Sequence, residues 1–89
     1  MDNSEKLTPE RYEVLRLVAE ISSKNSFKVC PIRDLIEVVT KRRPITPIAV
    51  RKMIYELSKS GYIENPLRGC WRLTEKGKKI LKEVEGWLK

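Results

Sequence analysis

The stretch Ile45–Ile63, ITPIAVRKMIYELSKSGYI, decides the fold of this chain. Thr46 can cap a helix, since its hydroxyl accepts a hydrogen bond from a free backbone N–H of the first turn. Pro47 suits the first helical position because it has no N–H to lose. Gly61 supplies the left-handed residue that ends a helix, and apolar residues follow it. The segment 46–60 is therefore predicted to be a single capped helix.

This predicted helix has one apolar face and one open face. The apolar residues recur at spacings of four and three, which places them on one side of a helix: Val50, Ile54 and Leu57. The opposite side carries Ile48, Ala49, Arg51, Lys52 and Tyr55. Two cations and an aromatic ring on the open face of an anchored helix indicate a surface that binds a partner.

Two further helices are predicted before this segment. The Thr-Pro start recurs at residues 8–9, and a broad apolar face follows it, which predicts a helix over residues 9–23. Phe27–Val29 alternates apolar, polar and apolar side chains and predicts a short strand. Pro31 opens a second helix, predicted over residues 31–40. The order helix, strand, helix, helix is thus expected.

A hairpin and a last helix are predicted after residue 61. Tyr62–Glu64 and Cys70–Leu73 are predicted strands, and the loop residues Asn, Pro and Gly between them favour a hairpin over residues 62–73. Thr74 is expected to cap a final helix over 75–89. One side of that helix is an apolar stripe of Ile80, Leu81, Val84, Trp87 and Leu88. Residues 1–7 are predicted to be a flexible N-terminus, 8–74 the folded domain and 75–89 the C-terminal helix.

The chain has 89 residues, which make one small domain with a core of marginal size. Neither a signal peptide nor an apolar run of the roughly 20 residues that a membrane span needs is present, so a cytoplasmic protein is expected. His and Gln are absent while Lys and Glu are abundant, which is typical of a thermophilic source.

The basic charge is concentrated in the second half of the chain. Residues 1–40 hold 6 basic and 7 acidic side chains, a net charge of −1, whereas residues 41–89 hold 13 basic and 5 acidic ones, a net charge of +8. An uneven distribution of this kind makes one electropositive surface, which favours a polyanionic partner.

Catalytic and metal-binding patterns are lacking. There is no His, no Gly-rich phosphate loop and no nucleophile with a plausible base, so neither an enzyme nor a cofactor is expected. The two cysteines, without His, cannot complete a tetrahedral zinc site. No small-molecule ligand is indicated.

The predicted elements resemble those of a winged-helix domain, and two segments carry the resemblance. Residues 45–64, ITPIAVRKMIYELSKSGYIE, resemble the recognition-helix segment of MarR- and PadR-type prokaryotic and archaeal transcriptional regulators. Residues 71–81, WRLTEKGKKIL, resemble the hairpin exit of the same families. The resemblance covers about residues 8–82. It implies an α+β, mostly α fold: a winged helix-turn-helix with a three-helix core, a short strand, a hairpin wing and an additional C-terminal helix.

The resemblance implies a DNA-binding transcriptional regulator, with helix 46–60 in the major groove and hairpin 62–73 on the DNA backbone. The DNA-facing residues carried over by position are Thr46, Ile48, Ala49, Arg51, Lys52, Tyr55 and, at the tip of the hairpin, Arg68. Arg51 can bind guanine, and Ile48 and Ala49 can touch thymine methyl groups. Lys41, Arg42 and Arg43 form a basic turn without a carboxylate close by, and we expect them to contact phosphates.

The same resemblance bears on the last helix and on the cysteines. The apolar stripe of the last helix either folds back on helix 9–23 or pairs with the same stripe of a second copy. The resemblance to these families favours the second alternative, a homodimer whose recognition helices lie about 34 Å apart, one turn of DNA. The first strand and the returning hairpin strand pair in such a sheet, which leaves two alternatives for Cys30 and Cys70. They form a disulfide, as in some hyperthermophile proteins, or two buried thiols.

Other functions stay open. A winged helix that binds another protein would use Ile48, Ala49, Met53 and Tyr55 as an apolar docking patch. An architectural protein would bind DNA with little specificity, and RNA binding ranks third because aromatic stacking platforms are absent. Salt dependence separates the first alternative from DNA binding, since phosphate contacts weaken steeply with salt.

Overall fold

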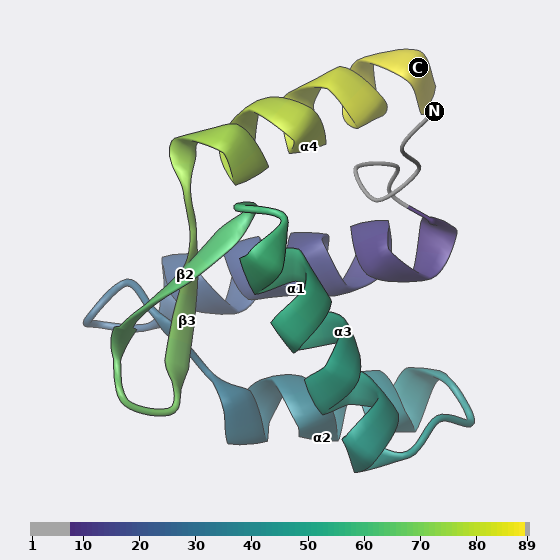
Figure 1. The fold of residues 1–89 in the computed structure, drawn as a ribbon, viewed down its shortest axis with the longest axis vertical. Helices are drawn as coiled ribbons and strands as arrows, with labels where there is room; N and C mark the ends of the chain where they lie inside the picture. Colours follow the sequence, from purple (N-terminus) through teal and green to yellow (C-terminus); the bar gives the residue numbers. More distant parts are fainter. Residues whose placement is uncertain (1–7, 89) are drawn as a thin grey trace.

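A computed structural model describes the backbone of residues 8–88 and the side chains of residues 8–84. Within this range the chain is α+β and mostly helical (Figure 1). The elements in order are α1 (Pro9–Lys24), β1 (Cys30–Pro31), α2 (Ile32–Arg42), α3 (Pro47–Lys59), β2 (Ile63–Leu67), β3 (Cys70–Leu73) and α4 (Glu75–Leu88). The strands form one antiparallel sheet in the order β1-β3-β2.

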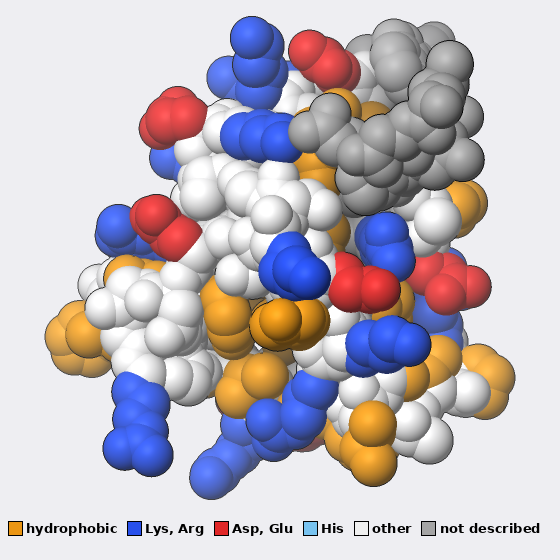
Figure 2. Space-filling model, viewed as in Figure 1, with side chains coloured by type: hydrophobic (Ala, Val, Ile, Leu, Met, Phe, Trp, Pro, Cys, Tyr) orange, Lys and Arg blue, Asp and Glu red, His pale blue; other side chains and the backbone are white. Residues whose placement is uncertain are grey.

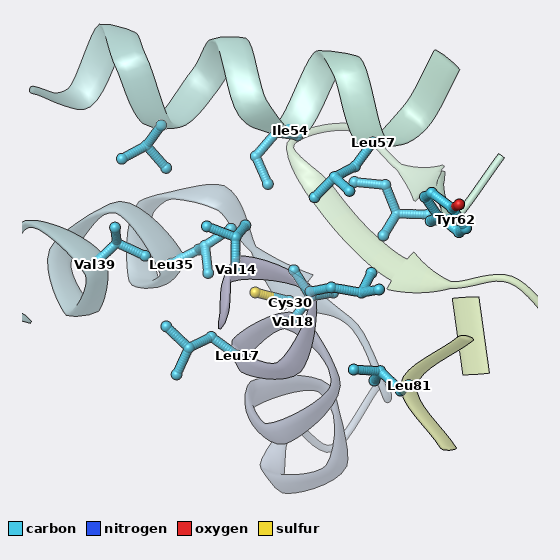
Figure 3. Close-up of a cluster of buried hydrophobic side chains, with 13 residues drawn as sticks. Val14, Leu17, Val18, Cys30, Leu35, Val39, Ile54, Leu57, Tyr62 and Leu81 are labelled. Atoms are coloured by element: carbon cyan, nitrogen blue, oxygen red, sulfur yellow. The ribbon is translucent and has the colours of Figure 1, made fainter. Parts of the chain in front are cut away.

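The core lies between α1, α2 and α3, and α1 is its centre (Figure 3). α1 packs against both other helices, the sheet and α4, and it contributes Val14, Leu15, Leu17 and Val18 to the core. The three predicted core residues of α3 are all at most 1% exposed: Val50, Ile54 and Leu57. Each such side chain contributes about 1.5–3 kcal/mol of transfer free energy, so burial of this stripe holds α3 against α1 and α2.

The ends of α3 are those predicted from the sequence. The Thr46 hydroxyl accepts a hydrogen bond from the Ala49 N–H at 3.2 Å, and Pro47 is the first helical residue. Gly61 has a φ of 85°, the left-handed conformation that lets the chain turn back toward the core. Tyr62 and Ile63, which follow, are both buried.

The first strand is not where the sequence pattern placed it. Phe27 and Lys28 lie in a turn: the Asn25 carboxamide oxygen accepts a hydrogen bond from the Phe27 N–H at 2.8 Å, and Lys28 has a φ of 59°. The strand begins at Cys30, which pairs with Trp71. The alternation in Phe27–Val29 therefore ends in one buried residue, Val29, while Phe27 is 76% exposed.

The hairpin of β2 and β3 is tighter than expected. Asn65 and Leu67, predicted to lie in a loop, belong to β2, and only Arg68 and Gly69 form the turn. An irregularity in pairing between Glu64 and Leu67 accommodates the proline of this edge strand. The Asn65 amide donates hydrogen bonds to the carbonyls of Leu67 at 2.7 Å and Cys70 at 2.5 Å, which stiffens the turn.

α4 folds back on α1 of the same chain. Thr74 caps it, accepting a hydrogen bond from the Gly77 N–H at 3.1 Å and donating one to the Gly61 carbonyl at 2.5 Å. Leu81, predicted to lie in a dimer interface, is instead 7% exposed and belongs to the core of the single chain. Ile80 also packs against this core.

Leu81 is buried because α4 packs against α1 and β3 of the same chain. Val84 is half-buried. The predicted interface residues Trp87 and Leu88 lie outside the described side chains.

No helix within residues 8–88 combines the length and the apolar character needed to cross a lipid bilayer.

Candidate nucleic-acid interface

The outward face of α3 carries a narrow stripe of exposed side chains. Ile48 is 78% and Tyr55 62% exposed, and Arg51 and Lys52 are exposed between them. The Lys59 ammonium lies over the Tyr55 ring, 5.4 Å from its centroid, and continues the stripe toward the C-terminus of the helix. The helix thus presents cations and one aromatic ring opposite its buried face, as predicted.

Two of the predicted contact residues play a lesser part in this stripe. Ala49 is half-buried and lines a hollow with Arg11 and Glu56, which form an ion pair at 2.7 Å. Thr46 is exposed, but its hydroxyl is engaged as the helix cap. Ile48 is therefore the apolar side chain that α3 exposes most.

A groove of about 690 Å³ lies beside the start of α3. Its walls are the first turn of α2, the first turns of α3 and the turn of the hairpin, and it is lined by Arg33, Arg51 and Arg68 together with Asp34. Figure 2 shows basic side chains projecting from this edge of the molecule, below α2, α3 and the hairpin turn of Figure 1.

Two contacts hold the walls of the groove together. β1 pairs with β3, so that Pro31 lies opposite Cys70. The Ile32 N–H then donates a hydrogen bond to the Gly69 carbonyl at 2.9 Å. Because Ile32 is the first residue of α2 and Gly69 belongs to the hairpin turn, Arg33 and Arg68 are attached to adjoining backbone segments.

The cations of the groove have no acidic partner within the described part of the chain. Arg33, Arg51 and Arg68 form no ion pair there, and neither does the nearby Lys52. Unpaired guanidinium groups at the surface keep their full charge available for an anion. The groove therefore carries three such charges against the one carboxylate of Asp34.

Two cations of the basic turn before α3 are paired with carboxylates, unlike the cations of the groove. This corrects the prediction that the turn has no carboxylate close by. Lys41 pairs with Glu37 at 3.0 Å, one helical turn earlier, and Arg43 pairs with Glu13 of α1 at 2.8 Å. The Arg43 hydrogen bond holds the pKa of Glu13 below its ordinary value, and Glu13 raises that of Arg43. The expectation that these residues lack a carboxylate was wrong, because helix spacing and the packing of α1 supply one.

Arg42 lies apart from the groove. It lines a separate hollow with Arg16, Glu13 and Glu20 of α1. Arg33 and Arg42 are at opposite ends of α2, about 14 Å apart along the helix axis at 1.5 Å per residue. None of the three cations of the basic turn therefore lines the groove that contains Arg51 and Arg68.

The hollow at the other side of the hairpin is different in charge. It has about 680 Å³ and is lined by Arg72 and Lys78, each paired with a carboxylate that also lines it. Arg72 pairs with Glu64 at 2.6 Å, and Lys78 with Glu75 at 3.6 Å. Lys28 also lines this hollow and forms no ion pair within the described residues, so it holds one unpaired cation, whereas the groove of Arg51 holds three.

Arg33 is the site residue that the sequence interpretation missed. It is exposed in the first turn of α2, whose buried residues are Leu35 and Val39. That outward position could be derived from helical periodicity, whereas its place beside Arg68 depends on the pairing of β1 with β3.

The cysteines are free thiols, and of the two predicted to be buried only Cys30 is buried, since Cys70 is half-buried. In an antiparallel pair directly opposite residues share a face and adjacent residues alternate. Cys30 faces Trp71 and Cys70 faces Pro31, so the two sulfurs lie on opposite faces of the sheet and the disulfide alternative is not formed. Burial, followed by the charge of Asp34, raises the pKa of Cys30 to about 12.

Comparison of the chain with protein-family models, with curated proteins and with solved structures yields no match.

Proposed function

We propose that this protein is a winged-helix transcriptional regulator that binds duplex DNA, with α3 in the major groove and the hairpin of β2 and β3, the wing, on the backbone. The observation that carries the proposal is the groove of unpaired Arg33, Arg51 and Arg68 beside the exposed stripe of α3.

The geometry of α3 supports a major-groove contact. B-DNA has a major groove about 12 Å wide, which admits one α-helix. The buried stripe of α3 faces α1 and α2, so the exposed stripe is available along the length of the helix. Arg51 is then near base edges, where a guanidinium binds guanine O6 and N7.

The groove supports a phosphate contact next to α3. Arg33 and Arg68 flank it from α2 and from the wing, and a phosphodiester strand following the groove would neutralise both. The element order α1–β1–α2–α3–β2–β3 with one antiparallel sheet is compatible with a winged helix. Regulation would then act by occupancy of a DNA site, with no chemical step.

The alternative of a protein-docking patch has less support. It requires Ile48, Ala49, Met53 and Tyr55 to form one apolar surface. Ala49 and Met53 are half-buried and line the hollow beside the Arg11–Glu56 ion pair, whereas Ile48 and Tyr55 stand on the outward stripe between cations. The four side chains therefore form no continuous apolar patch.

Fluorescence anisotropy of a labelled mixed-sequence duplex, measured over a range of salt concentrations, tests the proposal. Each phosphate contact contributes about 0.9 to the slope of log affinity against log salt. We expect Arg68→Ala and Arg33→Ala each to lower that slope by about one contact, and Arg51→Ala to weaken binding.

Arg72→Ala is the matched control, because Arg72 also lies in the wing but is paired with Glu64. It should leave the slope unchanged. Absence of binding by the wild type at low salt, or equal losses in Arg68→Ala and Arg72→Ala, would contradict the proposed interface.

A further inference from the structure

We infer that Ile48 recognises the 5-methyl group of thymine, so that α3 prefers a major groove that carries thymine methyl groups. The inference rests on the proposed function and names the base feature that the same surface recognises. It is carried by the position of one exposed apolar side chain among unpaired cations.

Ile48 stands on the centre line of the exposed stripe. At about 100° per residue, Ile48, Tyr55 and Lys59 fall within about 40° of one another around the helix axis, and Val50 and Leu57 lie on the opposite side. Ile48 is in the first turn of α3 and is 78% exposed, more than any other large apolar residue among the described ones. In the proposed complex it is therefore the apolar group that projects farthest toward the bases.

The surroundings of Ile48 favour DNA over a protein partner. Its neighbours three and four residues on are Arg51 and Lys52, which occupy the same side of the helix. Both are exposed and form no ion pair within the described chain. A protein partner would have to desolvate these charges to reach one isolated isoleucine.

Duplex DNA presents the complementary arrangement. In the major groove the thymine methyl is an isolated apolar group beside hydrogen-bond acceptors, and phosphates line the groove edges. Arg51, Lys52 and the cations of the groove would meet the phosphates and base acceptors, while Ile48 covers a methyl group and removes it from water. Charge complementarity and apolar contact are then satisfied together.

Other apolar residues of α3 are less suited to this contact. Ala49 is half-buried and faces the hollow of Arg11 and Glu56. Tyr55 is two turns farther along the helix, and its ring is covered by the Lys59 ammonium. The preference for a methyl group is therefore assigned to Ile48 alone.

The test compares two duplexes of the same thymine-rich sequence, one containing thymidine and the other deoxyuridine, which lacks the 5-methyl group. We expect the wild type to bind the thymidine duplex about three- to fivefold more tightly for each methyl group that Ile48 covers. Ile48→Ala should bind both duplexes equally, with the affinity of the wild type for the deoxyuridine duplex.

Leu67→Ala is the control variant, because Leu67 is an exposed apolar residue of the wing, at 53%. It should keep the wild-type preference. Circular dichroism checks that each variant is folded, which is expected since neither side chain belongs to the core.

The outcomes separate this inference from the proposed function. Salt-sensitive binding of the wild type to both duplexes with equal affinity would overturn the role of Ile48 and leave DNA binding intact. A preference that persists in Ile48→Ala would also overturn it, since the methyl group would then act through another residue or through DNA shape. Binding to neither duplex would overturn the inference and the proposed function together.

Discussion

Replacing Gly77 by alanine tests the closest approach in the fold. Gly77 is in the first turns of α4, at the point where this helix crosses the backbone of residue 62. A Cβ at Gly77 would overlap the carbonyl oxygen of Tyr62 and would lie 3.1 Å from its carbonyl carbon. It would also lie 3.4 Å from Cδ2 of Leu73. Two of these three atoms belong to backbone, which cannot move aside as a flexible side chain does.

The expected cost follows from three contributions. Forcing a methyl group into a filled space costs about 1–3 kcal/mol. The Tyr62 carbonyl also accepts a hydrogen bond from the Thr74 N–H at 3.0 Å, and displacing the carbonyl weakens a bond of about 1 kcal/mol. Alanine is about 1 kcal/mol better than glycine in a helix, which offsets part of the loss. The net destabilisation is about 2 kcal/mol, which lowers the melting temperature of a domain this size by about 8–16 °C.

Thermal and urea denaturation followed by circular dichroism measure this change. Lys79→Ala, at an exposed position of the same helix, is the control and should change stability by less than about 0.5 kcal/mol. If Gly77→Ala were as stable as the wild type or more stable, the higher helix propensity of alanine alone would explain the effect of the substitution on stability. The close crossing of α4 over residue 62 would then be refuted.

Two further predictions concern Glu13 and the cysteines. Because Arg43 holds the pKa of Glu13 below its ordinary 4.5, the pair stabilises the fold above about pH 4.5, and this contribution is lost as the pH falls through the lowered pKa. Glu13→Gln should therefore be less stable than the wild type at pH 7, with the difference vanishing in acid; a constant difference in urea titrations across pH would contradict this. Cys30 is buried with a pKa raised to about 12, so iodoacetamide at pH 8 should alkylate the half-buried Cys70 first; peptide mass spectrometry showing equal rates would refute the burial of Cys30.

The helices were predictable because their determinants are local. Thr46 and Pro47 start α3, Gly61 follows its end, and the spacing of its apolar residues defines its buried face. The strand predicted at Phe27–Val29 failed because alternation over so few residues is also compatible with a turn. What decides that turn is a hydrogen bond to the Asn25 side chain, which no hydrophobic pattern records.

The candidate site was predictable only in part. Arg51, Lys52 and Arg68 were found because helical periodicity and the hairpin tip place them outward. The pairing of Arg43 was not found because its partner Glu13 is 30 residues earlier and becomes a neighbour only when α1 packs beside the turn. The pairing of Lys41 with Glu37 was available from the sequence, since residues four apart face each other on a helix.

The hydrogen bond from Ile32 to Gly69 has a consequence for the thermodynamics of binding. Hairpin tips in many proteins are ordered only on contact with a ligand, and immobilising them consumes part of the interaction free energy. Here the hairpin turn is hydrogen-bonded to the first residue of α2, and the Asn65 amide donates hydrogen bonds to carbonyls on both sides of the turn. The backbone positions of Arg33 and Arg68, on either side of the groove, are therefore fixed in the free protein. In the proposed complex, ordering this backbone would cost little conformational entropy, so loss of the Ile32–Gly69 hydrogen bond would weaken anion binding while leaving every charge in place.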